Sequence, residues 1–196
     1  MRKELSPTII STVILLSAFF SLCPVDAGSA PAESRYGGYL VLGSLGDPKS
    51  FNPVIAQEVS TTMVTSFIFE GLTTVDPDTL KVIPNLAKGW KVSEDGLTWT
   101  FFLRQDVRWN DGEAFSAEDV LFTFDELIYN DEIPSSARDI FSIDGQPFKV
   151  RKLDAYTVEF TLPKPFAPFL RAMSQEILPR HVLADIVKDK KFNFHW

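Results

Sequence analysis

The sequence of 196 residues contains one cysteine and two histidines, and these low counts exclude several kinds of site. A single thiol, Cys23, cannot form an internal disulfide, so the folded part must be stabilised by its core. Zinc sites need three or four converging nitrogen, sulfur or oxygen ligands, and the spacing of Cys23, His181 and His195 resembles no such site. We therefore expect no metal site.

The sequence also lacks the short motifs of common enzymes. Gly43 and Gly46 have neither the lysine nor the helix context of a phosphate-binding loop, and no serine lies between glycines as in a nucleophile elbow. His181 follows Pro179 at an expected helix start. A catalytic histidine would need a partner nucleophile, and the sequence offers none, so a surface or capping role is the favoured interpretation. We expect no catalytic residue, no cofactor and a protein that is not an enzyme.

The sequence has fewer positively charged residues than negatively charged ones. Nineteen Lys and Arg against 26 Asp and Glu give a net charge of −7, which argues against nucleic acid and against an anionic membrane surface as partners. The 17 Phe and 4 Trp are many for this length and predict an aromatic core.

The start of the chain has the features of an export signal. A basic start ending at Lys3 precedes an apolar run over residues 9–22, which is shorter than the ~20 residues of a membrane-spanning helix. We expect a signal peptide over residues 1–27, cleavage after Ala27 and a periplasmic location. An uncleaved anchor is one alternative. Lipid attachment at Cys23 is another, although Leu22 is not the small residue that such sites favour.

Apolar periodicity and turn residues predict a mixed α/β domain after a flexible leader at residues 28–38. Asp95-Gly96 and Asp111-Gly112 predict tight turns. Ser116 and Asp119 predict a capping box that begins a helix with an apolar stripe at Val120, Phe124 and Leu127. The expected strands cover residues 39–42, 72–75, 90–92, 98–103, 148–153 and 157–162. The other expected helices cover 60–69, stopping at Gly71, and 166–173, with a last one from about 179.

Six segments in order resemble the family 5 extracellular solute-binding proteins, the oligopeptide, dipeptide and nickel-type receptors. The resemblance runs from about Tyr39 to the C-terminus, and its core is the stretch from Asn85 to Phe124. The matching segments are Asp47-Pro48-Lys49-Ser50-Phe51-Asn52-Pro53, Phe69-Glu70-Gly71-Leu72, Ser93-Glu94-Asp95-Gly96-Leu97-Thr98-Trp99, Val107-Arg108-Trp109-Asn110-Asp111-Gly112, Leu153-Asp154-Ala155-Tyr156-Thr157-Val158 and Ile177-Leu178-Pro179-Arg180-His181.

The resemblance implies an incomplete periplasmic-binding-protein-like fold of class II with an extra β-rich N-terminal subdomain. It implies a receptor for an ABC importer, by default for peptides, that delivers its solute to permease and ATPase subunits. Members of the family are much longer and have two lobes, so we expect this chain to be truncated before the second lobe. An inactive truncated relic is an alternative.

The resemblance also implies a division of residues 39–196 and a candidate site. We expect lobe 1 to start at residues 39–56, the extra subdomain to cover 57–163, and lobe 1 to resume, truncated, at 164–196. In the family the loop after the first strand faces the cleft, and here that loop spans residues 52–62. We expect Gln57 and Glu58 to face the ligand, while Ser60 suits a helix cap.

A second function class remains open from the residues alone. Two carboxylates about 5–10 Å apart could serve a secreted carbohydrate-active enzyme. The carboxylates that could form such a pair are Asp106, Asp111, Glu113, Glu118 and Asp119. Asp111 and Asp119 also have turn and capping roles, so the structural interpretation competes with the catalytic one.

Overall fold

The computed structural model describes residues 38–39, 41–44, 46–56 and 58–195, and the predicted signal peptide lies outside these residues, as does Cys23. The chain divides into two compact units, residues 1–42 and 43–196. In the first unit, Tyr39, Val41 and Leu42 are exposed and not in a strand, so the described residues of the strand predicted at 39–42 contradict that prediction. Strand geometry is stable when the backbone pairs with a neighbouring strand, which a local apolar pattern does not guarantee.

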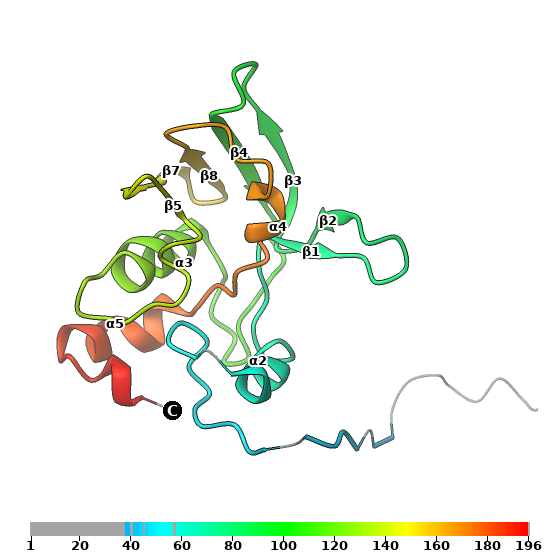
Figure 1. Cartoon of the computed structure of the whole chain (residues 1–196), viewed down its shortest axis with the longest axis vertical. Helices are drawn as coiled ribbons and strands as arrows, with labels where there is room; N and C mark the ends of the chain where they lie inside the picture. The colour runs from blue at the N-terminus through cyan, green and yellow to red at the C-terminus, as the bar shows by residue number, and fades with distance from the viewer. Residues whose placement is uncertain (1–37, 40, 45, 57, 196) are drawn as a thin grey trace, which may run out of the picture. The chain divides into compact units, whose positions relative to one another are not determined.

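The second unit is organised around an antiparallel sheet of four strands (Figure 1). Its strand order is β3 (Ala87–Val92), β4 (Thr98–Leu103), β8 (Thr157–Thr161) and β7 (Lys149–Asp154). The predicted turn at Asp95-Gly96 joins β3 to β4, and Gly96 has a φ of 72°, a conformation that glycine adopts without strain. Trp99 lies opposite Phe160 in the register, so both side chains project from the same face of the sheet.

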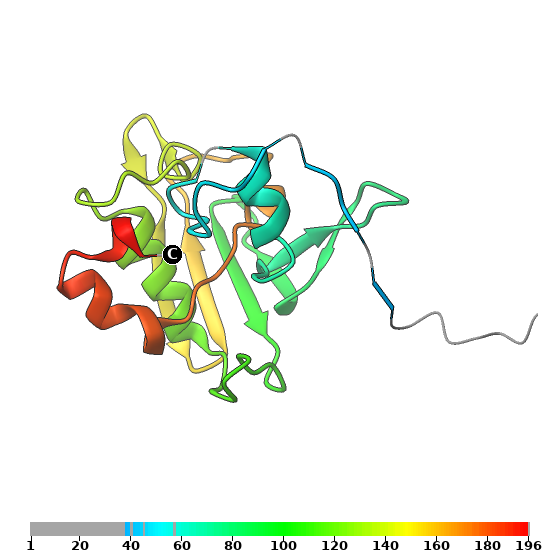
Figure 2. The ribbon, with the colours of Figure 1, turned by 90° about the horizontal axis from the view of Figure 1, so that it is seen from below.

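Helices cover this aromatic face. Helix α3 (Ala117–Leu121) runs directly into a π-helix, η1 (Phe122–Ile128), which the sequence pattern did not predict. The ring centroids of Phe124 and Phe160 are 5.0 Å apart, and those of Trp99 and Phe169, from the short helix α4 (Phe169–Ala172), are 5.1 Å apart. Figure 2 shows the α3–η1 segment beside the strands of the sheet. The predicted aromatic core is therefore confirmed as a sheet packed on helices along one face.

The capping box at the start of α3 is confirmed. The Ser116 hydroxyl accepts a hydrogen bond from the Glu118 amide at 3.3 Å, and the Asp119 carboxylate accepts one from the Ser116 amide at 2.9 Å. The other oxygen of Asp119 accepts from the amide of Arg180 at 3.0 Å, at the start of α5 (Arg180–Lys188). One buried carboxylate thus joins the first turns of two helices.

A second, smaller core lies between η1 and the C-terminal segment, which ends in the short helix η2 (Phe192–Phe194). Leu127 belongs to this cluster, whereas Val120 and Phe124 belong to the main one, so the predicted apolar stripe is buried along its length and contacts both cores. Asn52 is fully buried here and donates from its side-chain amide to the Phe192 carbonyl at 3.1 Å. That bond fixes the segment before α2 to the end of the chain.

The helix predicted at residues 60–69 is shorter and begins earlier than expected. Helix α2 covers Val59–Thr65, with Glu58 and not Ser60 at its cap position. The apolar spacing of Val64, Phe67 and Ile68, which favours a longer helix with these residues on its buried face, is misleading here. Phe67 and Ile68 lie beyond the helix and are exposed, while Thr61 and Thr65 are buried.

Gly71 has a role different from the predicted helix stop. A β-carbon added there would lie 2.5 Å from the backbone carbonyl carbon of Ser174, so glycine is required by close packing between two segments.

Two small hairpins complete the fold. Strand β1 (Thr73–Val75), which was predicted, pairs with β2 (Val82–Pro84), which was not. The pair β5 (Ser142–Ile143) and β6 (Gln146–Pro147) was not predicted either. Asp144 and Gly145, at φ of 52° and 75°, form the turn between β5 and β6. The mixed α/β class is confirmed by these elements, while the division into lobe and subdomain stays a prediction.

Candidate ligand-binding surface

The predicted site residues precede helix α2. Gln57 lies outside the described residues. Glu58 is half-buried, and its carboxylate accepts a hydrogen bond from the Thr61 hydroxyl at 2.9 Å. The same hydroxyl lies 2.9 Å from the Ser50 carbonyl oxygen, so Glu58 takes part in a polar contact that ties α2 to the preceding loop. Its predicted role toward a ligand stays a prediction.

The buried face of α2 leads to a second carboxylate. The hydroxyl of the fully buried Thr65 donates to Glu176 Oε1 at 2.9 Å, across 111 positions of sequence. Burial raises the pKa of Glu176 above its ordinary value, and the Thr65 hydrogen bond opposes that rise. Half-buried acids with perturbed pKa are candidates for binding sites.

Glu176 lines an open hollow of about 660 Å³. One wall comes from α2, through Thr62 and Ser66, and another from α4 and the segment after it, through Arg171 and Gln175. Its lining is rich in hydroxyl, amide and charged groups, which suits a polar ligand, and its size falls in the range of small-molecule sites. We call it the polar hollow.

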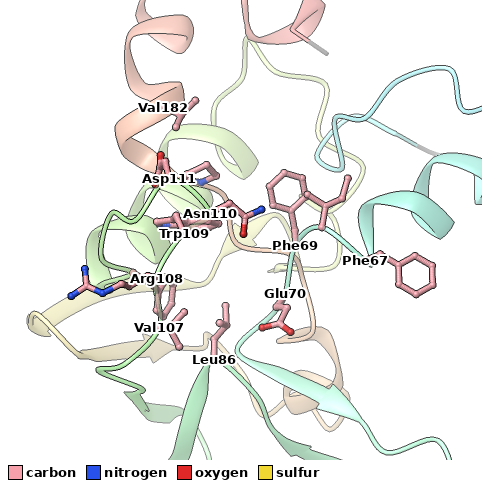
Figure 3. A pocket seen from close by; sticks show the side chains of 13 residues that line it. Phe67, Phe69, Glu70, Leu86, Val107, Arg108, Trp109, Asn110, Asp111 and Val182 are labelled. Atoms are coloured by element: carbon pink, nitrogen blue, oxygen red, sulfur yellow. The ribbon is translucent and has the colours of Figure 1, made fainter. Parts of the chain in front are cut away.

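A second hollow, of about 420 Å³, is mainly apolar (Figure 3). Residues 67–70 and 107–111 line it, together with the start of α5. In Figure 3, Phe69 and Asn110 approach each other from different segments, while Phe67 and Arg108 project away. The polar groups that line this apolar hollow belong to Glu70, Arg108, Asn110 and Asp111.

Asp111 and His181 form a close pair beside the apolar hollow. His181 Nε2 lies 2.6 Å from Asp111 Oδ2, and the Trp109 ring packs 6.4 Å from the imidazole. Hydrogen bonding from His181 is the main cause that holds the pKa of Asp111 below its ordinary value. The pair links the predicted Asp111-Gly112 turn to the first turn of α5, so it holds the turn in place and has no nucleophile beside it.

The other candidate carboxylates also have structural partners. Glu118 forms an ion pair with Lys152 of β7, and the Asp119 carboxylate accepts hydrogen bonds from the backbone amides of Ser116 and Arg180. Burial raises the pKa of Asp119, against the lowering effect of those two amides. Nothing in these contacts favours the carbohydrate-active alternative.

Two further kinds of feature are absent from the described residues. They contain no group of three or more His, Cys, Asp or Glu placed to hold a metal ion. The helices in the same part of the chain are all too short or too polar to span a bilayer.

Sequence reasoning missed the polar hollow. Thr65 and Glu176 are separated by 111 positions, and neither belongs to a motif. The only usable signal was the helical spacing of Thr61 and Thr65, which places both hydroxyls on one face.

Comparison with known proteins places the chain in a family. The sequence profile described as "Bacterial extracellular solute-binding proteins, family 5 Middle" matches residues 81–195. The "Dipeptide-binding protein" of Escherichia coli K12 is 36% identical over 152 residues, which is 70% of this chain and 28% of that protein.

Two solved structures have the same fold over most of the chain. NikZ from Campylobacter jejuni, in complex with Ni(L-His), is 34% identical, has a TM-score of 0.64 and is matched over 76% of this chain and 28% of its own. AppA from Bacillus subtilis, in complex with a nonapeptide, is 26% identical, has a TM-score of 0.65 and is matched over 74% of this chain and 29% of its own. The chain therefore spans less than a third of the length of each of these three proteins.

Proposed function

Since the chain belongs to the family 5 bacterial extracellular solute-binding proteins, we propose that it contributes to the peptide-binding receptor of an ABC importer. The match over residues 81–195 is the observation that carries the proposal. It is supported by similarity to a protein named for dipeptide binding and to a structure that holds a nonapeptide. The proposed partners are a peptide, the permease subunits and the ATPase subunits.

The proposal also covers where the chain acts and whether it changes its solute chemically. The chain would act after export, in the periplasm, with residues 1–27 removed as a signal peptide or with Cys23 carrying a lipid. It would bind its solute without chemical change. The absence of chemical change is supported by the contacts of Asp111, Glu118 and Asp119, each of which has a structural partner.

The proposed binding surface is the polar hollow together with the loop before α2. Gln57 and Glu58 remain proposed ligand-facing residues, because Glu58 is half-buried next to the hydroxyls of Thr61 and Thr62. A peptide backbone needs both hydrogen-bond donors and hydrogen-bond acceptors, and hydroxyl, amide and carboxylate side chains provide them.

A binding measurement on the isotopically labelled chain tests the proposal. Titration with the dipeptide Ala-Ala is expected to shift amide resonances near Thr62, Ser66 and Gln175, whereas galactose at the same concentration shifts none of them. Shifts with galactose and not with Ala-Ala would contradict the peptide assignment. Replacing Glu58 with Ala should weaken binding, while Ser60→Ala, two positions further on and without a role in the proposal, should not.

A further inference from the structure

An exposed aromatic side chain lies at the edge of the apolar hollow. Phe67, which follows α2, is 75% exposed, and its neighbour Ile68 is 50% exposed. Both residues line the hollow of about 420 Å³, and in Figure 3 the Phe67 ring projects away from it. An apolar cavity of ~150 Å³ is already large enough to hold benzene. The chain thus presents a projecting phenyl ring beside a recess that could accept one, and we call this area the Phe67 face.

The recess itself is lined by apolar side chains from several segments. Val107 and Trp109 come from the segment before the Asp111-Gly112 turn, Leu86 from the residue before β3, and Val182 from α5. Val182 is 45% exposed, so the apolar area extends beyond the recess. Burial of such a surface away from water is favourable, and exposed apolar areas of this kind mark sites of association.

The Phe67 face also carries charges of both signs. Glu70 and Arg108 line the hollow, and both are exposed. Neither forms an ion pair with a described residue, whereas Asp111, the third charged group of the lining, is paired with His181. Arg108 Nη1 donates to the Gly112 carbonyl at 2.9 Å, which holds the guanidinium and leaves its other N–H groups for a carboxylate. The face therefore offers an anion and a cation that do not neutralise each other within one chain.

A second copy of this chain is the partner that such a face fits. A two-fold symmetric dimer uses the same patch on both copies, so a projecting group must meet a recess of that patch and each charge must meet its opposite. The Phe67 ring and the apolar hollow meet the first condition, and Glu70 and Arg108 meet the second. We infer that the chain forms a two-fold dimer in which Phe67 of each copy enters the apolar hollow of the other, and Glu70 of each copy pairs with Arg108 of the other.

The dimer should be weak and should depend on concentration. A single aromatic anchor in a recess can supply much of the binding energy of an interface, but a small contact area gives affinities in the micromolar range or weaker. At low concentration the Phe67 face therefore stays in water, and at high concentration the second copy covers it.

Sedimentation equilibrium of the full chain over a wide range of concentrations measures the association. Wild type is expected to pass from monomer to dimer and no further, because a two-fold contact uses up the face of both copies. Phe67→Ser should weaken the dimer about tenfold or more, since it removes the anchor. Leu80→Asn is the control, because Leu80 is 70% exposed and lines neither hollow, so its loss should leave the association unchanged.

Charge reversal identifies the partner as a second copy. Glu70→Arg and Arg108→Glu should each weaken the dimer severalfold, because each variant brings like charges together across the interface. An equimolar mixture of the two variants should associate about as tightly as wild type, since each variant supplies the charges that the other needs. Glu94→Arg, on the exposed turn between β3 and β4, changes the net charge equally and should have no effect.

Several results would overturn the inference. A chain that stays monomeric at every concentration, or a dimer that Phe67→Ser leaves intact, would show that the Phe67 face does not bind a second copy. Assembly beyond the dimer would indicate an open head-to-tail contact in place of a two-fold one. A mixture of the two charge variants that associates no better than either alone would show that Glu70 and Arg108 do not meet across the interface. Peptide binding is measured separately by titration with Ala-Ala, so neither experiment decides the other.

Discussion

Gly71 shows how one residue can be required by a neighbour far away in sequence. The predicted role of Gly71 was to end a helix, but α2 already ends at Thr65. The constraint comes from the Ser174 backbone, which approaches so closely that a β-carbon would lie 2.5 Å from its carbonyl carbon. No local pattern contains that information, because the two segments meet only in the folded chain.

We expect Gly71→Ala to lower the free energy of unfolding by ~1–3 kcal/mol, because backbone atoms cannot move aside as a flexible side chain does. Urea unfolding followed by circular dichroism measures the change. Gly46→Ala is the matched control, since nothing lies within 4 Å of a β-carbon built at Gly46. Equal destabilisation of the two variants would show that the contact with Ser174 is not limiting.

The burial of Glu176 should make the free energy of unfolding depend on pH. Its pKa is raised in the folded chain, so the protonated form is favoured by folding and the charged form is not. The contribution of Glu176 to stability is thus fully present below its ordinary pKa and is lost as the pH rises through its raised value. Glu176→Gln should make the chain more stable than wild type near pH 7, and this gain should vanish at about pH 4.

Urea unfolding of wild type and Glu176→Gln at the two pH values tests the direction of this difference in stability. Comparing the two proteins at each pH cancels the titration of all other groups, including Asp111, whose pKa is lowered. A variant less stable than wild type near pH 7 would mean that the charge at Glu176 stabilises the free chain.

Elements with strong local signals were predictable from sequence, and those held in place by distant contacts were not. The strands β4 and β8 and the hairpin at Asp95-Gly96 follow alternation and turn chemistry, and the structure confirms them. The hairpin β5–β6 was missed because its two-residue strands are too short for any periodicity. The π-helix η1 was missed because its apolar spacing is close to that of an α-helix.

Asp119 joins two elements, and its removal should affect both. Its carboxylate accepts from the amides of Ser116 and Arg180, and only 4% of the residue is exposed. Asp119→Ala leaves both amides without their partner, so we expect a loss of ~2–4 kcal/mol in the free energy of unfolding. The control is Asp119→Asn, which keeps one acceptor oxygen and should cost less.

Hydrogen exchange shows where the effect of Asp119→Ala falls. Amides in the first turns of both α3 and α5 should exchange faster in the variant, because the carboxylate serves both helices. Faster exchange in α3 alone would mean that the bond to Arg180 has little effect on stability.

At the scale of the whole molecule, the family and the mixed α/β class were predictable because the matching segments are long and ordered. The candidate site was predictable only in part. The sequence pointed to Gln57 and Glu58 by resemblance, but it could not pair Glu176 with Thr65, because α2 and the segment after α4 meet only in the folded chain. Glu176 is thus an example of a site residue that emerges only from tertiary structure.

The inverted orientation of α2 leads to the last prediction. Two of its hydroxyls, on Thr61 and Thr65, are buried, while its apolar side chains Val59 and Met63 are 76% and 38% exposed. Val59 and Met63 are four residues apart and so lie along one side of the helix. Phe67, just beyond the helix, is 75% exposed and borders the apolar hollow. A contiguous exposed apolar surface of this kind is uncommon on a soluble domain. It should therefore bind a hydrophobic dye such as anilinonaphthalene sulfonate.

We expect the double substitution Val59→Ser and Phe67→Ser to reduce dye fluorescence severalfold while changing the free energy of unfolding by less than about 0.5 kcal/mol per site, because both side chains are already in water. Leu80→Asn is the matched control, since Leu80 is 70% exposed, lies in the loop between β1 and β2 and lines neither hollow. Loss of a single isolated apolar residue should leave the fluorescence unchanged. Equal fluorescence from wild type and the double variant would show that the dye binds elsewhere and that these side chains do not form one continuous apolar surface.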